Sequence, residues 1–312
     1  GGAVYNEGDF TLSGGEIENN TATSGGAIYN KGKIILSSGR IASNTASTSG
    51  AGVYNDKDAS LIMQGGEITL NSKTETGTSI LGSGIANYGS LYIYGGTLSS
   101  NGCEETGNGG GLYAGSDSYN YIENAKIENN SASAVSSGAN IYLSANAYAL
   151  IKNSVITSGR ESSSNAVMDI FATNATLILN SVTLNSSANS GSLRADNSNV
   201  TITNSYITNL KPNVDGVSFY IQGGNLVLEN TTISKTSNST SGVIYLDNVI
   251  TFNMTGSSLI ENNTRAIYVD VSKVATQVNI KHSLFSANSV TGNGGALLIK
   301  GSASTKVNAN IL

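Results

Sequence analysis

The sequence has 312 residues, of which 12% are charged, with 37 Gly, one Pro and no Trp, and Asn, Ser and Thr make up much of the remainder. This composition disfavours helices and favours short strands joined by tight turns. The net charge of −5 comes from scattered residues, so it excludes a basic surface for nucleic acid, and no apolar run approaches the about 18 residues of a membrane span.

A repeated segment opens the chain. The stretch GGAVYNEGDFTLSGGEIENNTATS, residues 1–24, nearly recurs as GGAIYNKGKIILSSGRIASNTASTS, residues 25–49. The apolar residue after Gly-Gly-Ala can be followed through the whole chain at spacings of 23 to 32 residues, and we call this set the anchor column. Its members are Val4, Ile28, Val53, Ile85, Leu112, Ile141, Ile170, Leu193, Phe219, Ile244, Ile267 and Leu297. Periods of this size indicate stacked repeats and not two globular domains.

Each repeat carries two further apolar marks. The second mark is usually a pair of apolar residues separated by one residue, as in Phe10 and Leu12, which is the period of a strand. The third mark is an apolar residue five positions later. Its members are Ile17, Ile41, Ile68, Leu98, Ile127, Ile156, Leu184, Ile207, Ile233, Leu259 and Phe285. Each repeat is therefore predicted to hold three short strands.

Three strands per repeat without a helical segment predict one coil of a parallel β-helix. Leucine-rich repeats have one strand per unit, and a propeller blade needs about 40 residues. We predict an all-β, single-stranded, right-handed parallel β-helix of about 12 coils of three short strands, stacked about 4.8 Å apart. Residues 1–312 form one solenoid domain, which starts and ends inside a repeat and is expected to be a segment of a longer repetitive protein.

The position two residues after each anchor must also point into the coil. In the first four repeats this position holds Asn6, Asn30, Asn55 and Asn87, which we expect to form a hydrogen-bonded asparagine ladder. A second set of Asn follows the third mark, and we assign it to a turn where Asn adopts and caps left-handed backbone. This set is Asn20, Asn44, Asn71, Asn101, Asn130, Asn262 and Asn288.

The position directly after each anchor must face solvent, and it is rich in tyrosine. Eight of the 15 Tyr lie there: Tyr5, Tyr29, Tyr54, Tyr113, Tyr142, Tyr220, Tyr245 and Tyr268. Such a line of rings either stabilises the sheet by stacking or provides a platform for glycan rings or for a partner's aromatic side chains. For the second interpretation the candidate binding residues are Tyr54, Tyr113, Tyr142, Tyr220, Tyr245 and Tyr268.

Asp247 and Asp270 are predicted to be neighbours on adjacent coils, with Arg265 close by. Paired carboxylates suit glycan hydrolysis, and a cation with a basic side chain suits a polysaccharide lyase, so these three residues are weak catalytic candidates. The alternative is that they are solvated acids that limit edge association, because the flanking IYLDN and IYVDV lack further acidic and basic groups.

Other motifs give no site. NDKDAS at residues 55–60 lacks the rest of a calcium loop, and GNGGGLYAG lacks the lysine of a phosphate-binding loop. Cys103 lies in a polar stretch and cannot form an internal disulfide, and His282 is the only histidine. We therefore expect no metal and no cofactor.

Several motifs resemble those of a known family. FSANSVTGNGGALLIKG, residues 285–301, joins an F-x-x-N tetrapeptide to G-G-A-L, and GGAV, GGAI and IASN repeat the theme at Gly1, Gly25 and Ile41. The sequence resembles the passenger repeats of the polymorphic outer-membrane proteins and is similar to the wider set of pectin-lyase-like β-helix adhesins. That resemblance implies an extracellular or cell-surface location and a role in adhesion.

Three functions therefore stay open. The first is a non-enzymatic surface rod that binds a glycan or protein of a host or neighbouring cell. The second is a polysaccharide lyase or hydrolase. The third is a structural spacer or a fibre segment that associates end to end through exposed strand edges.

The insertions between the third mark and the next anchor should emerge on one side of the rod, where repeat proteins often bind partners. The longest lie at residues 70–83 and 101–108, in neighbouring repeats. We expect them to form one raised, weakly acidic patch that supports binding together with Tyr54 and Tyr113.

Overall fold

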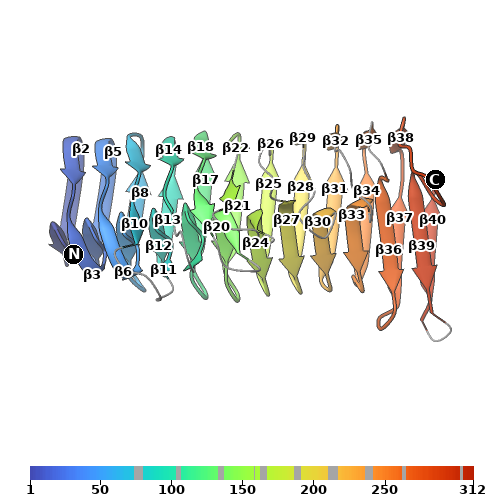
Figure 1. Cartoon of the computed structure of the whole chain (residues 1–312), viewed down its shortest axis with the longest axis horizontal. Helices are drawn as coiled ribbons and strands as arrows, with labels where there is room; N and C mark the ends of the chain where they lie inside the picture. The colour runs from blue at the N-terminus through green and yellow to red at the C-terminus, as the bar shows by residue number, and fades with distance from the viewer. Residues whose placement is uncertain are drawn as a thin grey trace.

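The computed structural model describes residues 1–73, 80–102, 107–132, 137–157, 159–161, 167–185, 191–209, 217–235, 242–261, 265–302 and 305–312. These residues wind into a right-handed parallel β-helix, a rod with the N-terminus at one end and the C-terminus at the other (Figure 1). The predicted fold class is confirmed. Within the ranges given above there is no helix long and apolar enough to cross a membrane.

The first strand of each coil lies in a twelve-stranded parallel sheet. Its strands are β1 (Val4–Asn6), β4 (Ile28–Asn30), β7 (Val53–Asn55), β12 (Ile85–Asn87), β16 (Leu112–Ala114), β20 (Gly138–Leu143), β24 (Met168–Thr173), β27 (Gly191–Asp196), β30 (Val217–Gln222), β33 (Gly242–Asp247), β36 (Ile267–Val271) and β39 (Leu297–Gly301). Each anchor lies opposite the anchor of the next coil, from Val4 against Ile28 to Ile267 against Leu297. The anchor register predicted from the sequence is confirmed throughout.

The second and third strands of the coils together form a 21-stranded sheet. The second strands are β2 (Asp9–Glu18), β5 (Lys33–Ala42), β8 (Ser60–Met63), β13 (Ser90–Ile93), β17 (Tyr119–Glu123), β21 (Tyr148–Lys152), β25 (Thr176–Asn180), β28 (Asn199–Thr203), β31 (Asn225–Glu229), β34 (Thr251–Thr255), β37 (Thr276–Ile280) and β40 (Val307–Ile311). In the first two coils β2 and β5 also supply the third strand. The other third strands are β9 (Glu67–Thr69), β14 (Gly96–Ser99), β18 (Ala125–Glu128), β22 (Val155–Thr157), β26 (Thr183–Asn185), β29 (Tyr206–Thr208), β32 (Thr232–Ser234), β35 (Leu259–Glu261) and β38 (Leu284–Ser286).

Short additional strands follow the third strand. They are β3 (Thr21–Ser24), β6 (Thr45–Ser49), β10 (Ser72–Lys73), β11 (Ile80–Leu81), β15 (Gly107–Asn108), β19 (Ser131–Ala132) and β23 (Arg160–Glu161). The first five form a small parallel sheet, and β19 pairs with β23. This part of the coil therefore carries a partial fourth strand in addition to the three that the sequence predicts.

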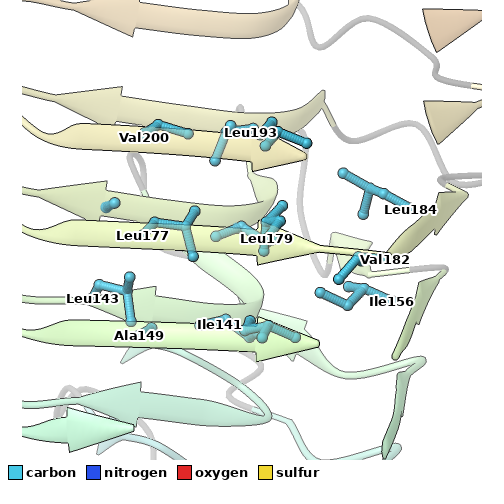
Figure 2. Close-up of a cluster of buried hydrophobic side chains, with 14 of the residues drawn as sticks. Ile141, Leu143, Ala149, Ile156, Leu177, Leu179, Val182, Leu184, Leu193 and Val200 are labelled. Atoms are coloured by element: carbon cyan, nitrogen blue, oxygen red, sulfur yellow. The ribbon is translucent and has the colours of Figure 1, made fainter. Parts of the chain in front are cut away.

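The core is a continuous column of apolar side chains inside the coils. Ile28, Val53 and Ile244 are fully buried, whereas Tyr29 and Tyr54, one position later in their strands, are partly exposed. Figure 2 shows the interior of three successive coils, where Leu177 and Leu179 of one coil lie between the side chains of its neighbours. The prediction that the anchors face inward and the Tyr column outward is confirmed.

One predicted core position is wrong. In the tenth coil Ile260, which is fully buried, lies opposite Ile233 and Phe285, whereas the expected Leu259 is partly exposed. The turn before β35 contains one more residue than the equivalent turns, and Gly256 accommodates it with a φ of 66°. Because two apolar residues stand side by side here, the sequence did not distinguish them.

The asparagine ladder in the first sheet is present and is one residue longer than expected. Each side-chain Nδ2 donates to Oδ1 of the next coil: Asn6 to Asn30, Asn30 to Asn55 and Asn55 to Asn87 at 2.7 Å, and Asn87 to Asn120 at 2.8 Å. Asn120 comes from β17 and not from the first sheet, where the fifth coil has Ala114. A side chain from the neighbouring strand thus continues the ladder.

The second set of asparagines also forms a ladder. The expectation of left-handed backbone at these residues is wrong, because the left-handed position is one residue earlier. The left-handed residues are those directly before them: Asn19, Ser43, Leu70, Ser100, Asn129 and Ala287. The Asn side chains point inward, and Nδ2 donates to the next Oδ1 at 2.9 to 3.1 Å from Asn20 through Asn44, Asn71 and Asn101 to Asn130. Asn288 donates to the Ile260 carbonyl at 2.8 Å, and Asn262 lies outside the described residues.

Glycines make room for this second ladder. Gly84 and Gly111 stand directly before their anchors, at the position that faces the ladder. A Cβ at Gly84 would lie 2.9 Å from Nδ2 of Asn101, and one at Gly111 would lie 2.9 Å from Nδ2 of Asn130. Both distances are too short for a side chain, so glycine here serves the packing of the ladder.

Candidate ligand-binding face

The outward residues of the first sheet form a nearly continuous aromatic stack, which we call the tyrosine ladder. Centroids of neighbouring rings are 4.6 to 5.8 Å apart within its two segments. The first segment is Tyr5, Tyr29, Tyr54, Tyr88, Tyr113, Tyr142 and Phe171, and the second is Tyr220, Tyr245 and Tyr268. All six tyrosines predicted as binding residues therefore belong to one surface feature.

Arg194 joins the two segments. Its guanidinium lies 5.5 Å from the ring centroid of Phe171 and 5.1 Å from that of Tyr220. It also forms a two-point ion pair with Asp196, with Nε 3.0 Å from Oδ1 and Nη2 3.1 Å from Oδ2. A planar cation between two rings keeps the stack intact where the column lacks an aromatic residue.

Sequence reasoning missed Tyr88. The fourth coil has Ala86 in the ladder position, and the ring of Tyr88, two residues later, fills the space between Tyr54 and Tyr113. Gly115 allows this, because a Cβ there would lie 2.4 Å from Cδ1 of Tyr88. Three features of the sequence could have indicated this ring: the small Ala86 in the ladder position, Tyr88 two residues later and Gly115 in the next coil.

The rings of the ladder are stacked in most places and tilted at Tyr88 and Tyr268, where the interplanar angles are 38° to 59°. The stacked pairs have interplanar angles of 10° to 29°, so neighbouring rings turn their faces toward one another. Carboxylates accept hydrogen bonds from several of the hydroxyls: Asp56 from Tyr29 at 3.1 Å, Asp247 from Tyr220 at 2.7 Å and Asp270 from Tyr268 at 3.3 Å. The exposed edge therefore carries a row of phenols, some of them bonded to carboxylates, and the row is interrupted at Phe171 and Arg194.

Burial within the stack raises the pKa of several of these phenols above that of a free tyrosine. Burial and then the neighbouring Tyr29 raise the pKa of Tyr54 to about 12. Burial together with the charges of Asp270 and Asp247 raises the pKa of Tyr245 to about 12. Burial and the hydrogen bond to Asp247 also raise the pKa of Tyr220. The ladder thus favours the neutral phenol.

We expect the fold to lose stability as the pH rises through this range. A phenol whose pKa lies near 10 when unfolded and near 12 in the ladder binds its proton more tightly in the folded chain. Its stabilising contribution is therefore complete below pH 10 and is lost as the pH rises toward 12.

Phenolate absorbance and melting temperature, followed together from pH 9 to about pH 12, test this expectation. Tyr206 provides the internal contrast, because hydrogen bonds with Ser234 and Thr208 lower its pKa. A single titration step shared by all tyrosines, with no fall in melting temperature, would contradict the prediction.

The carboxylates proposed as catalytic candidates lie where the sequence placed them. Asp247 is opposite Asp270 on adjacent strands β33 and β36. Asp247 accepts hydrogen bonds from Tyr220 and from Gln222 at 3.0 Å, and Asp270 is 3.5 Å from the ammonium of Lys300. Each carboxylate is therefore already held by donors of the ladder edge.

Arg265, the third candidate, packs on the ladder. Its guanidinium lies 5.8 Å from the ring centroid of Tyr268, and Nη2 donates to the Asn293 carbonyl at 3.2 Å. These contacts give Arg265 the same ring-covering role that Arg194 has between the two ladder segments.

A second aromatic cluster was not predicted. The cluster lies on the outside of β13, β17 and β21, with centroid distances of 5.4 to 6.4 Å between neighbours. Its members are Tyr92, Tyr119, Tyr121 and Tyr148 in these strands and Tyr94 directly after β13. Tyr121 donates to Glu123 at 2.7 Å, and Lys152 lies over its ring. The alternation of Tyr with inward residues in LYIY and YNYI was the sequence signal for this cluster.

The predicted loop patch can be placed only in part. Residues 74–79 and 103–106 lie outside the described residues, and so does Cys103. The flanking strands are neighbours, with Ile80 opposite Gly107 and Ser72 bridged to Gly102. Among the residues that the structure describes, no group of three or more His, Cys, Asp and Glu side chains is arranged to hold a metal ion.

The fold and its ladders define a right-handed β-helix, and comparison with protein families agrees. The model of the right-handed β-helix region matches residues 139–312, which is more than half of the chain. The chain belongs to the right-handed β-helix family. The twelve-stranded sheet continues into residues 1–138, with Leu112 of β16 opposite Ile141 of β20. No curated protein and no solved structure matches the chain.

Proposed function

We propose that the chain is a non-enzymatic β-helical rod, secreted or displayed at the cell surface, that acts in adhesion by binding a glycan along the tyrosine ladder. The observation that carries this proposal is the row of phenol and carboxylate groups at the ladder edge. The phenols recur once per coil over the first six coils and again over the ninth to eleventh, about 4.8 Å apart, and therefore suit a polymer that repeats hydroxyl groups on a similar scale.

The polar partners along the second ladder segment support a binding role. Tyr220, Gln222 and Asp247 form one hydrogen-bonded group, and Tyr268, Asp270 and Lys300 form the next. Their side chains are partly exposed or fully exposed, so they can exchange water for the hydroxyls of a sugar. The resemblance of the Gly-Gly-Ala and F-x-x-N motifs to surface-displayed passenger repeats supports the same location.

The right-handed β-helix family contains both enzymes and non-enzymes. We therefore propose separately that this chain does not catalyse a reaction. Asp247 and Asp270 each accept a phenol hydrogen bond, and Asp270 also faces the Lys300 ammonium. Glycoside hydrolysis needs two carboxyl groups that can reach the glycosidic bond and a water or the sugar carbon, whereas these two are engaged by donors of the ladder edge. The pair therefore suits hydrogen bonding to a ligand better than acid catalysis.

Retention of the chain on immobilised cellulose, chitin, xylan, homogalacturonan and mucin tests the proposal. We expect retention on at least one of them, and we expect the double variant Tyr220→Phe with Tyr268→Phe to bind about tenfold more weakly. Phenylalanine keeps the stacked rings and removes only the hydroxyls. The variant should therefore melt close to the parent, which separates a binding role from a stabilising one.

Tyr206→Phe is the matched control, because Tyr206 is 44% exposed on β29 and lies outside the ladder. Equal retention of the parent and the ladder variant would contradict the proposal. Release of reducing or unsaturated sugar ends from any of the polymers would overturn the non-enzymatic assignment. Concentration-dependent self-association without any retention would favour the spacer or fibre function instead.

A further inference from the structure

A notch interrupts the surface between the two aromatic clusters. The turn between the first and second strands has four residues in the third coil, between Asn55 and Ser60, and four in the fifth coil, between Ala114 and Tyr119. In the fourth coil it has only two, Tyr88 and Gly89. The short turn between two longer ones leaves a cavity of about 420 Å³.

The walls of the notch combine rings and charges. Tyr88 of the tyrosine ladder and Tyr119 of the second aromatic cluster both line it. Lys57 and Asp58 project from the turn on one side, and Asp117 projects with Ser116 from the turn on the other. Sites of about 300 to 1,000 Å³ that combine aromatic walls with a few polar groups are typical of small-ligand binding.

Two of the charged groups are available to a ligand. Within the described part of the chain, neither the ammonium of Lys57 nor the carboxylate of Asp58 makes a hydrogen bond or an ion pair. Asp117 accepts one hydrogen bond, from Nδ2 of Asn146 at 3.1 Å, and this leaves its second oxygen open. The notch thus offers one cation and two anions within reach of two rings.

The local backbone keeps the notch open. Asp58 and Asp117 have φ values of 68° and 61°, which turn both residues outward at equivalent places in the two longer turns. A Cβ at Gly89 would lie 2.3 Å from the carbonyl oxygen of Ala59, so the floor of the notch requires glycine. The shape therefore follows from the backbone and does not depend on side chains alone.

We propose that this notch binds the terminal pyranose unit of a neutral glycan. The C–H groups of a pyranose ring carry partial positive charge that suits the negative face of an aromatic ring, and carboxylates accept hydrogen bonds from sugar hydroxyls. The two carboxylates outnumber the single ammonium, so an acidic sugar is disfavoured. The inference rests on the proposed function, because it assumes that the rod binds glycans. It adds a pocket that recognises the end of the glycan.

Titration of the full chain with the methyl glycosides of glucose and of N-acetylglucosamine, followed by NMR, tests the proposal. We expect saturable shifts of the Tyr88 and Tyr119 signals with at least one of them and none with methyl glucuronide. The double variant Asp58→Asn with Asp117→Asn should bind about tenfold more weakly, because it removes two charged acceptors. Asparagine is compatible with the left-handed turns, since Asn146 already occupies the equivalent position with a φ of 61°.

Tyr119→Ala and Tyr148→Ala form the matched pair of ring variants. The two rings stack at 5.4 Å, but only Tyr119 lines the notch, so only its loss should weaken binding. No saturable shift with either neutral glycoside, or unchanged affinity in the notch variants, would overturn the inference. If the polymers are retained through Tyr220 and Tyr268 while the notch variants bind like the parent, this inference fails and the proposed function stands.

Discussion

Asn55→Leu is expected to lower the free energy of unfolding by about 2 to 4 kcal/mol, although leucine is apolar and of similar size. Asn55 accepts a hydrogen bond from Asn30 and donates to Asn87, both at 2.7 Å. Its Nδ2 also donates to the carbonyls of Ala59 and Ser90 at 3.3 and 3.2 Å. Leucine makes none of these bonds, so buried polar groups above and below it lose partners.

Denaturant unfolding measures this loss, and hydrogen exchange locates it. Because each coil contacts only its neighbours, we expect protection to fall first in β4, β7 and β12. Asn225→Leu is the matched control: Nδ2 of Asn225 donates to Oδ1 of Asn199 at the same 2.7 Å, but that pair is exposed. The control should change stability by no more than about 0.5 kcal/mol. Equal losses in the two variants would show that the buried ladder adds nothing.

Phe219→Ala is expected to cost about 3 to 5 kcal/mol, the largest effect of any single change considered. Among the described residues, Phe219 is one of the two largest fully buried side chains. It lies opposite Leu193 and Ile244, and the cavity left by its ring cannot close because the sheet register fixes the backbone on both sides.

Phe219→Leu is the comparison for this cavity. Leucine is present at the same column position in Leu193, so it should fit at a cost of about 1 kcal/mol. Denaturant midpoints of the two variants give the difference. An alanine variant as stable as the leucine variant would mean that the coil collapses around the missing ring.

The period of the apolar residues was sufficient to predict the coils. Backbone register repeats once per coil, so every anchor could be found by counting, and the adjacency of Asp247 and Asp270 followed from the same count. Counting gave the wrong core residue where a turn contained one extra residue that no sequence pattern revealed. The extra residue before Ile260 shifted the third mark by one position.

Counting along the sequence could not identify side chains that complete a ladder from a different strand or turn of the coil. Tyr88 completes the tyrosine ladder from a turn, and Asn120 extends the asparagine ladder from β17. Both replace a residue that is too small for its column, Ala86 in one case and Ala114 in the other. Counting along the sequence identifies residues at equivalent backbone positions. It does not identify a side chain from another strand or turn that fills the space left by a small residue. The notch was missed for the same reason, since it arises from the difference in length of three turns.

The second asparagine ladder has an electrical consequence. All its side-chain amides point the same way, each N–H toward the C-terminal end, and the row continues from Asn130 through Asn140 to the carboxylate of Asp169, at 2.9 and 3.2 Å. Amide dipoles aligned head to tail add up to a partial positive charge at the end where the N–H groups point, as at the N-terminus of a helix. Asp169 is fully buried, and its Oδ1 also accepts the backbone N–H of Gly159 at 2.7 Å. The ladder thus acts as a macrodipole built from side chains, and the buried carboxyl group of Asp169 lies at its positive end.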